Sequence, residues 1–489
     1  MAFVDRIDEL AFFNSLLTAR QPTPARLVLL YGRRRVGKTE LLRHWFENVP
    51  IPSTYIAFER DPAVIQRKKL AAQVKNTTVD QVPSFDTWQQ FWSWLAAEWR
   101  NDPHILIVDE VTYASDADEA MLSSLQSAWD QTFKQSRAII CLCGSHVQSL
   151  EKLMHHGSPL FGRFTNVWYL QPFEYGVLQQ VFPKWSVEER VAAYAIVGGV
   201  PAYLEWLDPS QSLVENIRKV ILNPGGMFLT EPIFLLYDEL ERIQTYHAIV
   251  RAIGIGMHTL DEISNETLVA KTNLTEYLQR LQEIRLIERR QPVTLPERKL
   301  RTARRGRYHL TDPFFRFYFA FLRPRQGELP DPEAILTRVK TQLRGFVGGS
   351  AFEEIARRWV QQAARTGRLP FVPEAIGAHW SRYVQVDVVA INRAEHRLLL
   401  GECKWTDDPI SLATVRELIE DKLPKVLADM AGDDTAKRGA EHVAAYGAQW
   451  TVSIAFFSRR GFTPEARARI HKEGGLAIDL AQLDADLKR

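Results

Sequence analysis

Cysteine is scarce in this chain, which has only three among its 489 residues: Cys141, Cys143 and Cys403. Cys141 and Cys143 alternate along an apolar run, so we expect both to point to the same side of a strand as small buried side chains. Three cysteines placed in this way form no disulfide framework and lack the spacing of a zinc site. A reducing, cytoplasmic setting is therefore expected.

Long apolar runs and a strong net charge are missing as well. No run approaches the ~18 apolar residues that a membrane helix needs. The charged N-terminal sequence MAFVDRIDEL lacks the apolar core of a signal peptide, and we expect no membrane partner. The 61 Lys and Arg residues nearly balance the 59 Asp and Glu residues, for a net charge of +2. This balance neither favours nor excludes nucleic acid, because local clustering of charge matters more than the total.

The length of the chain predicts about two to four domains, since 489 residues exceed one ordinary core. Residues 1 to about 230 alternate between short apolar runs and helical segments, which predicts a parallel α/β sheet. Residues 237–324 are mostly helical and then form two short strands, which is the outline of a winged helix. A proline-containing linker at 328–332 precedes a second α/β unit.

One helical segment is rich in tryptophan. Trp88, Trp92, Leu95 and Trp99 recur at helical spacing and form one face. Such a face either stacks on a cofactor or a base, or packs in the core. The packed core face is the favoured interpretation.

The clearest motif is the run GRRRVGKT at residues 32–39, which matches G-x-x-x-x-G-K-[ST]. Its glycines allow backbone N–H groups to curl around phosphates. Lys38 brings positive charge to the β- and γ-phosphates, and the Thr39 hydroxyl can bind magnesium. An apolar strand at 26–31 precedes the run, and a helix at 40–47 follows it with its positive dipole end towards the anion. ATP and Mg²⁺ are thus the expected ligands, and the expected nucleotide-binding residues are Gly32, Arg33, Arg34, Arg35, Val36, Gly37, Lys38, Thr39 and Glu40.

Two carboxylates end the apolar run HILIVDE at residues 104–110. We expect Asp109 to hold magnesium, directly or through a water molecule, and Glu110 to orient and activate the attacking water. The alternative is a buried strand that merely ends in polar residues. One helix later, Ser145 ends another apolar run. Because polar groups at strand ends line the ligand crevice of an α/β sheet, Ser145 either senses the γ-phosphate or merely terminates its strand.

A candidate arginine finger follows at Arg163, in the run PLFGR at residues 159–163. An arginine supplied by a neighbouring molecule can neutralise the charge that develops during phosphoryl transfer. An ordinary surface arginine is the alternative. If the finger acts between molecules, the active form is a homo-oligomer.

Taken together, these motifs resemble the archaeal-type AAA+-related P-loop ATPase family. The resemblance implies that the box of Arg6 and Glu9 lies near the base of the nucleotide, and that a Gly-Gly-x-Pro-x-Tyr motif belongs to helices of a lid. Where the family often has a second serine after the sensor glycine, this chain has His146, so only Ser145 is given the sensing role. Besides the phosphate loop, the segments that carry the resemblance are FVDR at 3–6 with Glu9 and Leu10, VDE at 108–110, GS at 144–145, PLFGR at 159–163 and GGVPAYL at 198–204.

A basic run lies between the two predicted strands of the winged helix. Such a loop can follow a phosphate backbone and gain affinity by releasing counterions, so DNA is an expected partner. A solvated loop or a protein-contact loop is the alternative. The six cations of the run are Arg298, Lys299, Arg301, Arg304, Arg305 and Arg307.

The C-terminal part contains a candidate nuclease site. Glu402 and Lys404 alternate on one face of a predicted strand, and an adjacent strand can present Asp387 to the same point. Two carboxylates and a lysine suit metal-dependent phosphodiester hydrolysis. The acids hold magnesium, while the metal and the lysine activate water and stabilise charge. Glu353 on the preceding helix is the expected supporting acid.

This order of residues resembles the restriction-endonuclease-like (PD-(D/E)xK) domain that follows the ATPase in the same family. The position before the aspartate departs from such domains, which commonly carry a glutamate one or two places earlier, where Gln385 and Val386 stand here. This departure disfavours a two-metal site, and an inactive nuclease fold used for binding or assembly is the alternative. The segments that carry the resemblance are FE at 352–353, IG at 376–377 with Trp380, VD at 386–387 and GECKW at 401–405.

The expected organisation is an AAA+-like ATPase domain with a helical lid at 1–236, a winged-helix domain at 237–325 and a restriction-endonuclease-like domain at 326–489. The expected function is an ATP-hydrolysing P-loop ATPase that acts on or near DNA and carries a magnesium-dependent nuclease. The alternatives are a nucleotide-dependent switch or scaffold with an inactive nuclease fold, and a signalling ATPase.

Overall fold

A computed structural model describes residues 3–18, 25–99, 102–240, 243–296, 306–323, 331–437 and 440–489. The chain forms two compact units. Unit 1 comprises Met1–Phe173 and Val200–Glu205, and unit 2 comprises Glu174–Gly199 and Trp206–Arg489. This division differs from the boundaries predicted at 236/237 and 325/326. Most of the predicted lid belongs to unit 2, together with the helical region and the C-terminal sheet. The three-domain organisation stays a prediction.

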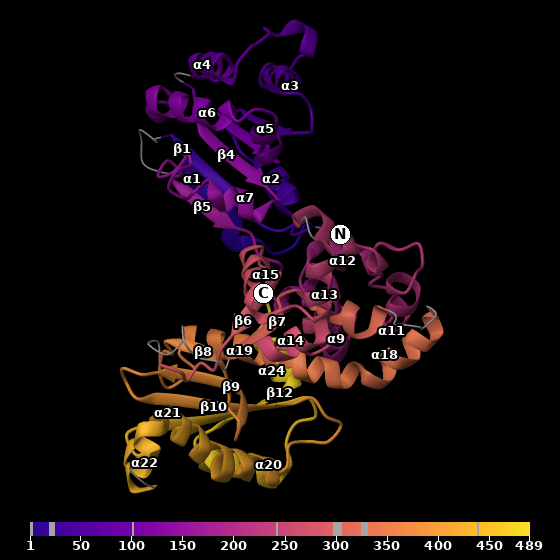
Figure 1. The fold of residues 1–489 in the computed structure, drawn as a ribbon, viewed down its shortest axis with the longest axis vertical. Helices are drawn as coiled ribbons and strands as arrows, with labels where there is room; N and C mark the ends of the chain where they lie inside the picture. Colours follow the sequence, from indigo (N-terminus) through magenta and orange to yellow (C-terminus); the bar gives the residue numbers. More distant parts are fainter. Residues whose placement is uncertain are drawn as a thin grey trace. The chain divides into compact units, whose positions relative to one another are not determined.

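Unit 1 is built on a five-stranded sheet with the order β2-β3-β4-β1-β5. Figure 1 labels β1, β4 and β5 of this sheet. All four strand pairs are parallel, which confirms the predicted parallel sheet. Because β4 lies between β1 and β3, the ends of these three strands meet at one edge. The strands are β1 (Arg26–Tyr31), β2 (Ser53–Ala57), β3 (Ile105–Asp109), β4 (Ile139–Gly144) and β5 (Asn166–Tyr169).

Helices cover both faces of this sheet, and alternate side chains of each buried strand feed two separate cores. Leu27 and Leu29 join the core on one face, whereas Val28 and Leu30 join the core on the other. The helices of unit 1 are α1 (Ile7–Thr18), α2 (Lys38–Phe46), α3 (Ala63–Lys75), α4 (Trp88–Glu98), α5 (Val111–Ala117), α6 (Ala120–Gln131) and α7 (Val147–Lys152), together with most of α10 (Pro201–Trp206).

Two expectations about buried side chains are confirmed in unit 1. Cys141 and Cys143 lie in the same core and are fully buried. On α4, Trp88 and Trp92 are fully buried as well, in the core on the other face of the sheet. The tryptophan face therefore packs inside the unit, and no ring of this pair is available to stack on a base.

The first half of unit 2 is mostly helical and contains one antiparallel strand pair. Helices α13 (Ile243–Gly254), α14 (Leu260–Thr267) and α15 (Lys271–Glu283) precede β6 (Ile287–Arg290) and β7 (Arg307–Leu310). A capping box between Thr259 and Glu262 begins α14. The other helices of this half are α8 (Leu178–Val181), α9 (Val187–Val197), α11 (Leu213–Asn216), α12 (Glu231–Glu239), α17 (Pro313–Phe317) and α18 (Pro332–Val347).

The second half of unit 2 contains a mixed five-stranded sheet with the order β12-β11-β10-β9-β8. The pairs β8–β9 and β9–β10 are antiparallel, and the pairs β10–β11 and β11–β12 are parallel. The strands predicted at 384–391, 396–402 and 452–457 correspond to three of the five. The strands are β8 (Ala375–Trp380), β9 (Gln385–Asn392), β10 (Arg397–Lys404), β11 (Thr451–Ser458) and β12 (Leu476–Asp479).

Helices surround this second sheet, and the last of them contacts the start of unit 2. On α24, Asp484 accepts hydrogen bonds from Tyr175 at 2.5 Å and from Arg190 at 2.6 Å. Within the described ranges, no helix combines the length and apolar character that crossing a bilayer requires. The helices of this half are α19 (Glu353–Arg365), α20 (Leu412–Arg416), α21 (Leu423–Lys437), α22 (Ala440–Gly447), α23 (Pro464–Lys472) and α24 (Leu480–Asp486).

Candidate functional site

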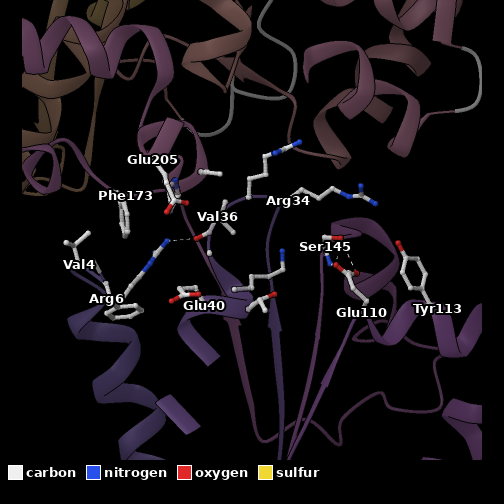
Figure 2. Close-up of a pocket in the computed structure, with 17 residues that line it drawn as sticks. Val4, Arg6, Arg34, Val36, Glu40, Glu110, Tyr113, Ser145, Phe173 and Glu205 are labelled. Carbon is white, nitrogen blue, oxygen red and sulfur yellow. Dashed lines mark hydrogen bonds between the residues drawn. The ribbon is translucent and has the colours of Figure 1, made fainter. Parts of the chain in front are cut away.

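A pocket of about 600 Å³ lies in unit 1 at the loop that joins β1 to α2 (Figure 2). The loop, the carboxyl ends of β3 and β4, the N-terminal segment and α10 all contribute to its walls. Its lining residues are Phe3, Val4, Arg6, Arg34, Arg35, Val36, Gly37, Lys38, Thr39, Glu40, Glu110, Tyr113, Ser145, Phe173, Pro201, Ala202 and Glu205.

The loop itself has the close backbone packing that its glycines predict. A Cβ atom on Gly32 would stand 2.6 Å from the carbonyl oxygen of Leu170, so a larger residue requires the backbone to shift. Gly37 has a left-handed backbone with φ +85°, where glycine carries little steric cost, and α2 begins directly after it. The run at 32–39 is thus held in a tight turn at the N-terminus of a helix.

Lys38 is drawn into this turn. Its Nζ atom donates hydrogen bonds to the carbonyl oxygens of Gly32 at 2.8 Å and Arg33 at 3.0 Å, and the side chain is buried. Burial lowers the pKa of Lys38, and the nearby carboxylates of Glu110 and Asp109 act in the opposite direction. The ammonium therefore lies in the loop where bound phosphates are expected.

The predicted magnesium ligands come together at the end of β3. The Thr39 Oγ1 atom donates to Asp109 Oδ2 at 2.8 Å, and the Tyr55 hydroxyl donates to the same oxygen at 2.8 Å. Hydroxyl and carboxylate oxygens are the donors that magnesium prefers, and it usually takes only one or two carboxylates together with substrate phosphates and waters. Thr39 and Asp109 therefore fit a magnesium that the nucleotide helps to bind. Across the described ranges no group of three or more His, Cys, Asp or Glu is arranged to hold a metal ion.

Tyr55 was not among the predicted site residues. It lies on β2, two residues before the position that pairs with Asp109. Burial, followed by the charge of Asp109, raises the pKa of Tyr55, so its hydroxyl keeps the proton that it donates.

Glu110 and Ser145 also meet at this edge of the sheet. The Ser145 hydroxyl donates to Glu110 Oε1 at 2.8 Å, and the Ser145 backbone N–H donates to Oε2 at 3.2 Å. Glu110 has a left-handed backbone with φ 50°, an uncommon conformation for a residue with a side chain. The carboxylate is therefore fixed at the pocket wall by Ser145, although the role of Ser145 towards a γ-phosphate stays a prediction.

Arg6 closes the opposite wall of the pocket. Its guanidinium donates to the carbonyl oxygens of Val36 at 2.7 Å and Gln171 at 2.8 Å, and it lies 4.4 Å from the centre of the Phe173 ring. It also pairs with Glu9 at 3.0 Å. Figure 2 shows Arg6 and Phe173 on the side of the pocket away from Glu110 and Ser145. This wall contains the early Arg–Glu box.

Arg163, the predicted arginine finger, does not line the pocket of its own chain. Its guanidinium forms a two-pronged ion pair with Asp130, at 3.0 Å from Nε and 2.7 Å from Nη2. Its action on a neighbouring molecule stays a prediction, and it would require this pair to open.

A second cluster of charged side chains lies on the C-terminal sheet. The Lys404 Nζ atom is 2.8 Å from Glu402 Oε1, and Asp387 Oδ2 accepts a hydrogen bond from the backbone N–H of Cys403 at 3.1 Å. Burial and the charge of Asp387 raise the pKa of Glu353 to about 7, whereas burial and the charge of Glu402 raise that of Asp387 to about 6. All four predicted residues thus belong to one electrostatically linked cluster.

Lys422 completes this cluster and was not predicted. Its ammonium contacts both oxygens of Glu402, at 2.9 Å and 2.8 Å, from the π-helical segment η8 (Glu417–Lys422). Glu402 is 4% exposed and forms ion pairs with the ammonium groups of both Lys404 and Lys422. A metal ion could use Glu402 only after at least one lysine had moved, so the fit of this site to magnesium is incomplete as it stands.

Most of the predicted basic run falls outside the described residues, namely Arg298, Lys299, Arg301, Arg304 and Arg305. Arg307 lies on β7, and its guanidinium stands 5.1 Å from the centre of the Trp380 ring.

Comparison with known proteins places this chain in a family. Residues 3–207 match the family described as an ATPase domain predominantly from Archaea, and residues 318–418 match the family described as Archaea bacterial proteins of unknown function. The uncharacterized protein MJECL04 of Methanocaldococcus jannaschii is 30% identical over 406 residues, which cover 83% of this chain and 88% of that protein.

Two solved structures are also similar to this chain. The Walker-type ATPase paby2304 of Pyrococcus abyssi has a TM-score of 0.45 at 20% identity and covers 65% of this chain and 96% of that one. The ORC2 protein of Aeropyrum pernix, in its ADPNP–ADP complexes, has a TM-score of 0.42 at 13% identity. The match covers 70% of this chain and 95% of the ORC2 chain. The chain therefore belongs to the same family as MJECL04, and its residues 3–207 form an ATPase domain of the kind found predominantly in Archaea.

Proposed function

We propose that this chain is a magnesium-dependent ATPase that acts on or near DNA. The arrangement around Lys38 carries the proposal, because one loop and two strand ends bring an ammonium, a Thr–Asp oxygen pair and a fixed carboxylate to a single pocket. These are the groups that hydrolysis of a nucleoside triphosphate requires: a phosphate cradle, metal ligands and a carboxylate for water.

Each group has a role in this reaction. Lys38 and the loop N–H groups bind the phosphates. Thr39 and Asp109 would hold magnesium, which supplies positive charge at the phosphate oxygens when it is bound. Glu110 orients the attacking water and accepts its proton, and Ser145 keeps this carboxylate at the pocket wall.

Phosphate release by the purified protein tests this proposal. With Lys38→Ala we expect loss of both nucleotide binding and turnover, because Lys38 is the only lysine among the described residues that line the pocket. With Glu110→Gln we expect retained binding and lost turnover, because only the activation of water is removed. A wild-type protein that binds neither adenine nor guanine triphosphates would refute the proposal.

The DNA part of the proposal is supported by the helical region of unit 2. Three helices followed by an antiparallel strand pair suit a winged helix, and the loop between β6 and β7 contains the basic run. We expect DNA affinity to fall steeply with salt, because phosphate contacts release counterions. Replacing Arg304 and Arg305 by alanine should weaken binding and reduce the salt slope by about 2. Binding that ignores both salt and these substitutions would contradict this assignment.

A second candidate function is metal-dependent cleavage of DNA by the C-terminal sheet. The convergence of Glu353, Asp387, Glu402 and Lys404 favours it. We expect Asp387→Ala and Lys404→Ala to abolish cleavage in magnesium or manganese without affecting ATP turnover. If the wild type cuts neither single- nor double-stranded DNA, the alternative of a nucleotide-dependent scaffold is supported instead.

A further inference from the structure

The cationic side chains of the nucleotide pocket come mostly from one short loop. Among the described residues that line the pocket, the cations are Arg6, Arg34, Arg35 and Lys38. Helix α10 contributes Pro201, Ala202 and Glu205 to the lining and brings no positive charge. Besides a bound magnesium, the positive charge that the described pocket lining can bring to the γ-phosphate therefore comes from this loop, unless a second molecule supplies more.

Arg6 and Lys38 are both held by backbone carbonyl oxygens. Arg6 is engaged by the carbonyl oxygens of Val36 and Gln171, on the wall away from the carboxylate of Glu110. Lys38 lies inside the loop and donates to its carbonyl oxygens. Arg163, the one arginine whose motif suggests a finger, is paired with Asp130 outside the pocket lining.

Arg34 lies on the catalytic side of the pocket. It lines the pocket together with Glu110 and Ser145, and Figure 2 shows it on their side, away from Arg6. Its positive charge contributes to lowering the pKa of Lys38, after the larger effect of burial, which indicates that the two cations are neighbours.

We propose that Arg34 is a catalytic arginine supplied by the phosphate loop itself, whose guanidinium contacts the γ-phosphate of the ATP bound in the same chain. This inference rests on the proposed ATPase function and adds to it the claim that hydrolysis needs no arginine from a partner. A guanidinium suits this role because it keeps its charge at any working pH and can form two parallel hydrogen bonds to phosphate oxygens.

The reaction balances without any further reactant. The water oxygen bonds to the γ-phosphorus while the bond from that phosphorus to the β–γ bridging oxygen breaks, and its electron pair leaves with ADP. One water proton passes to Glu110 and from there to solvent. Arg34 and Lys38 neutralise the negative charge on the transferred group and on the bridging oxygen.

Steady-state turnover and nucleotide affinity of Arg34 variants test the inference. Arginines in this role contribute about 10³–10⁵ to kcat. We therefore expect Arg34→Ala to lower kcat by at least about 100-fold, with a much smaller change in the affinity for ADP. Arg34→Lys keeps the charge but loses the planar fork, and we expect an intermediate kcat. Retained ADP binding shows that each variant is folded.

Mixing of two inactive proteins separates action within a chain from action between chains. An Arg34→Ala protomer has a complete Lys38, and a Lys38→Ala protomer has a complete Arg34. If Arg34 acts within its own chain, every site in the mixture lacks one of the two groups, and turnover stays at the low level of the Arg34→Ala protein alone at all protein concentrations.

Several outcomes would overturn the inference. Recovered turnover in the mixture would assign Arg34 to a neighbour's site. An unchanged kcat in Arg34→Ala, or a lost affinity with an unchanged kcat, would remove its catalytic role while leaving the ATPase proposal intact. A wild type that hydrolyses no nucleotide would overturn the proposed function and this inference together.

Discussion

Removing the hydroxyl of Tyr55 should impair magnesium use without unfolding the protein. This hydroxyl donates to Asp109 Oδ2 at 2.8 Å, the same oxygen that Thr39 contacts. In Tyr55→Phe the ring remains on β2, and Asp109, which is 3% exposed, loses one of its side-chain donors. The carboxylate is then less firmly oriented towards the position where magnesium would bind.

The magnitude follows from the kind of hydrogen bond that is lost. A hydrogen bond to a charged group contributes about 1.5–3 kcal/mol, and each 1.4 kcal/mol is about a factor of ten in an equilibrium constant. Loss of a partner that orients a metal ligand typically costs about 10–100-fold in metal affinity. We therefore expect the magnesium concentration for half-maximal ATP hydrolysis to rise by about 10–100-fold, while kcat at saturating magnesium falls much less.

A magnesium titration of phosphate release at saturating ATP measures this shift directly. Tyr31→Phe is a matched control, because it also removes one tyrosine hydroxyl at a strand of the same sheet, and that hydroxyl contacts Glu151 rather than Asp109. Its half-maximal magnesium should stay close to the wild-type value. A Tyr55→Phe protein with an unchanged magnesium requirement would refute the view that Tyr55 positions Asp109.

Three further predictions concern unit 2. Asp484→Ala should lower the free energy of unfolding by about 3–5 kcal/mol in a denaturant titration, because it leaves the buried charge of Arg190 without its carboxylate. His309→Gln should flatten the acid side of the stability curve: burial lowers the pKa of His309 to about 2, so the unfolded state binds the proton more readily and stability falls as the pH drops from about 6.5 towards 2. This histidine contributes at most about 2 kcal/mol of destabilisation between pH 7 and pH 5. Lys422→Ala should lower the manganese concentration for half-maximal DNA cleavage, because it removes one of the two ammonium groups that a metal ion must displace from Glu402, whereas Lys425→Ala, which removes an exposed lysine paired with Asp421, should not.

Each of these predictions has an outcome that contradicts it. Asp484→Ala with wild-type stability would show that water reaches Arg190 and solvates its charge. A His309→Gln protein that keeps the full acid sensitivity would assign that sensitivity to other groups, such as His247, whose pKa burial lowers to about 4. Equal manganese requirements in the Lys422 and Lys425 variants would make the contact with Glu402 a purely structural one.

The sequence predicted the parts of the site that follow one another along the chain. The run at 32–39 needed only its own spacing, and Asp109 with Glu110 needed only an apolar strand that ends in two acids. The parallel sheet then brings these segments to one edge, as alternation of strands and helices indicated. Local pattern was sufficient here because the chemistry sits at strand ends.

The residues that the sequence did not predict lie on elements whose neighbours depend on topology. Tyr55 belongs to an ordinary apolar strand, and only the order β2-β3 brings it beside Asp109. Lys422 ends the run ELIEDK, which has the charge pattern of a solvated helix, yet its side chain is only 15% exposed. Neither contact is encoded by spacing, because each joins residues that are more than fifteen positions apart and fixed by the fold.

Arg163 illustrates the opposite case. Its motif suggests an arginine finger, but within one chain Arg163 contacts Asp130 and does not line the nucleotide pocket. Its ion pair with Asp130 uses one edge of the guanidinium, through Nε and Nη2, and its side chain is 26% exposed. An exposed pair of this kind contributes about 0–1 kcal/mol, so it presents little barrier to a competing phosphate. The pair by itself therefore does not decide whether Arg163 acts on a neighbour. The decisive comparison is with Arg34, which already lines the pocket: if one arginine in the loop suffices for turnover, specific activity is independent of protein concentration, whereas a finger from a neighbour makes it rise with concentration as molecules associate.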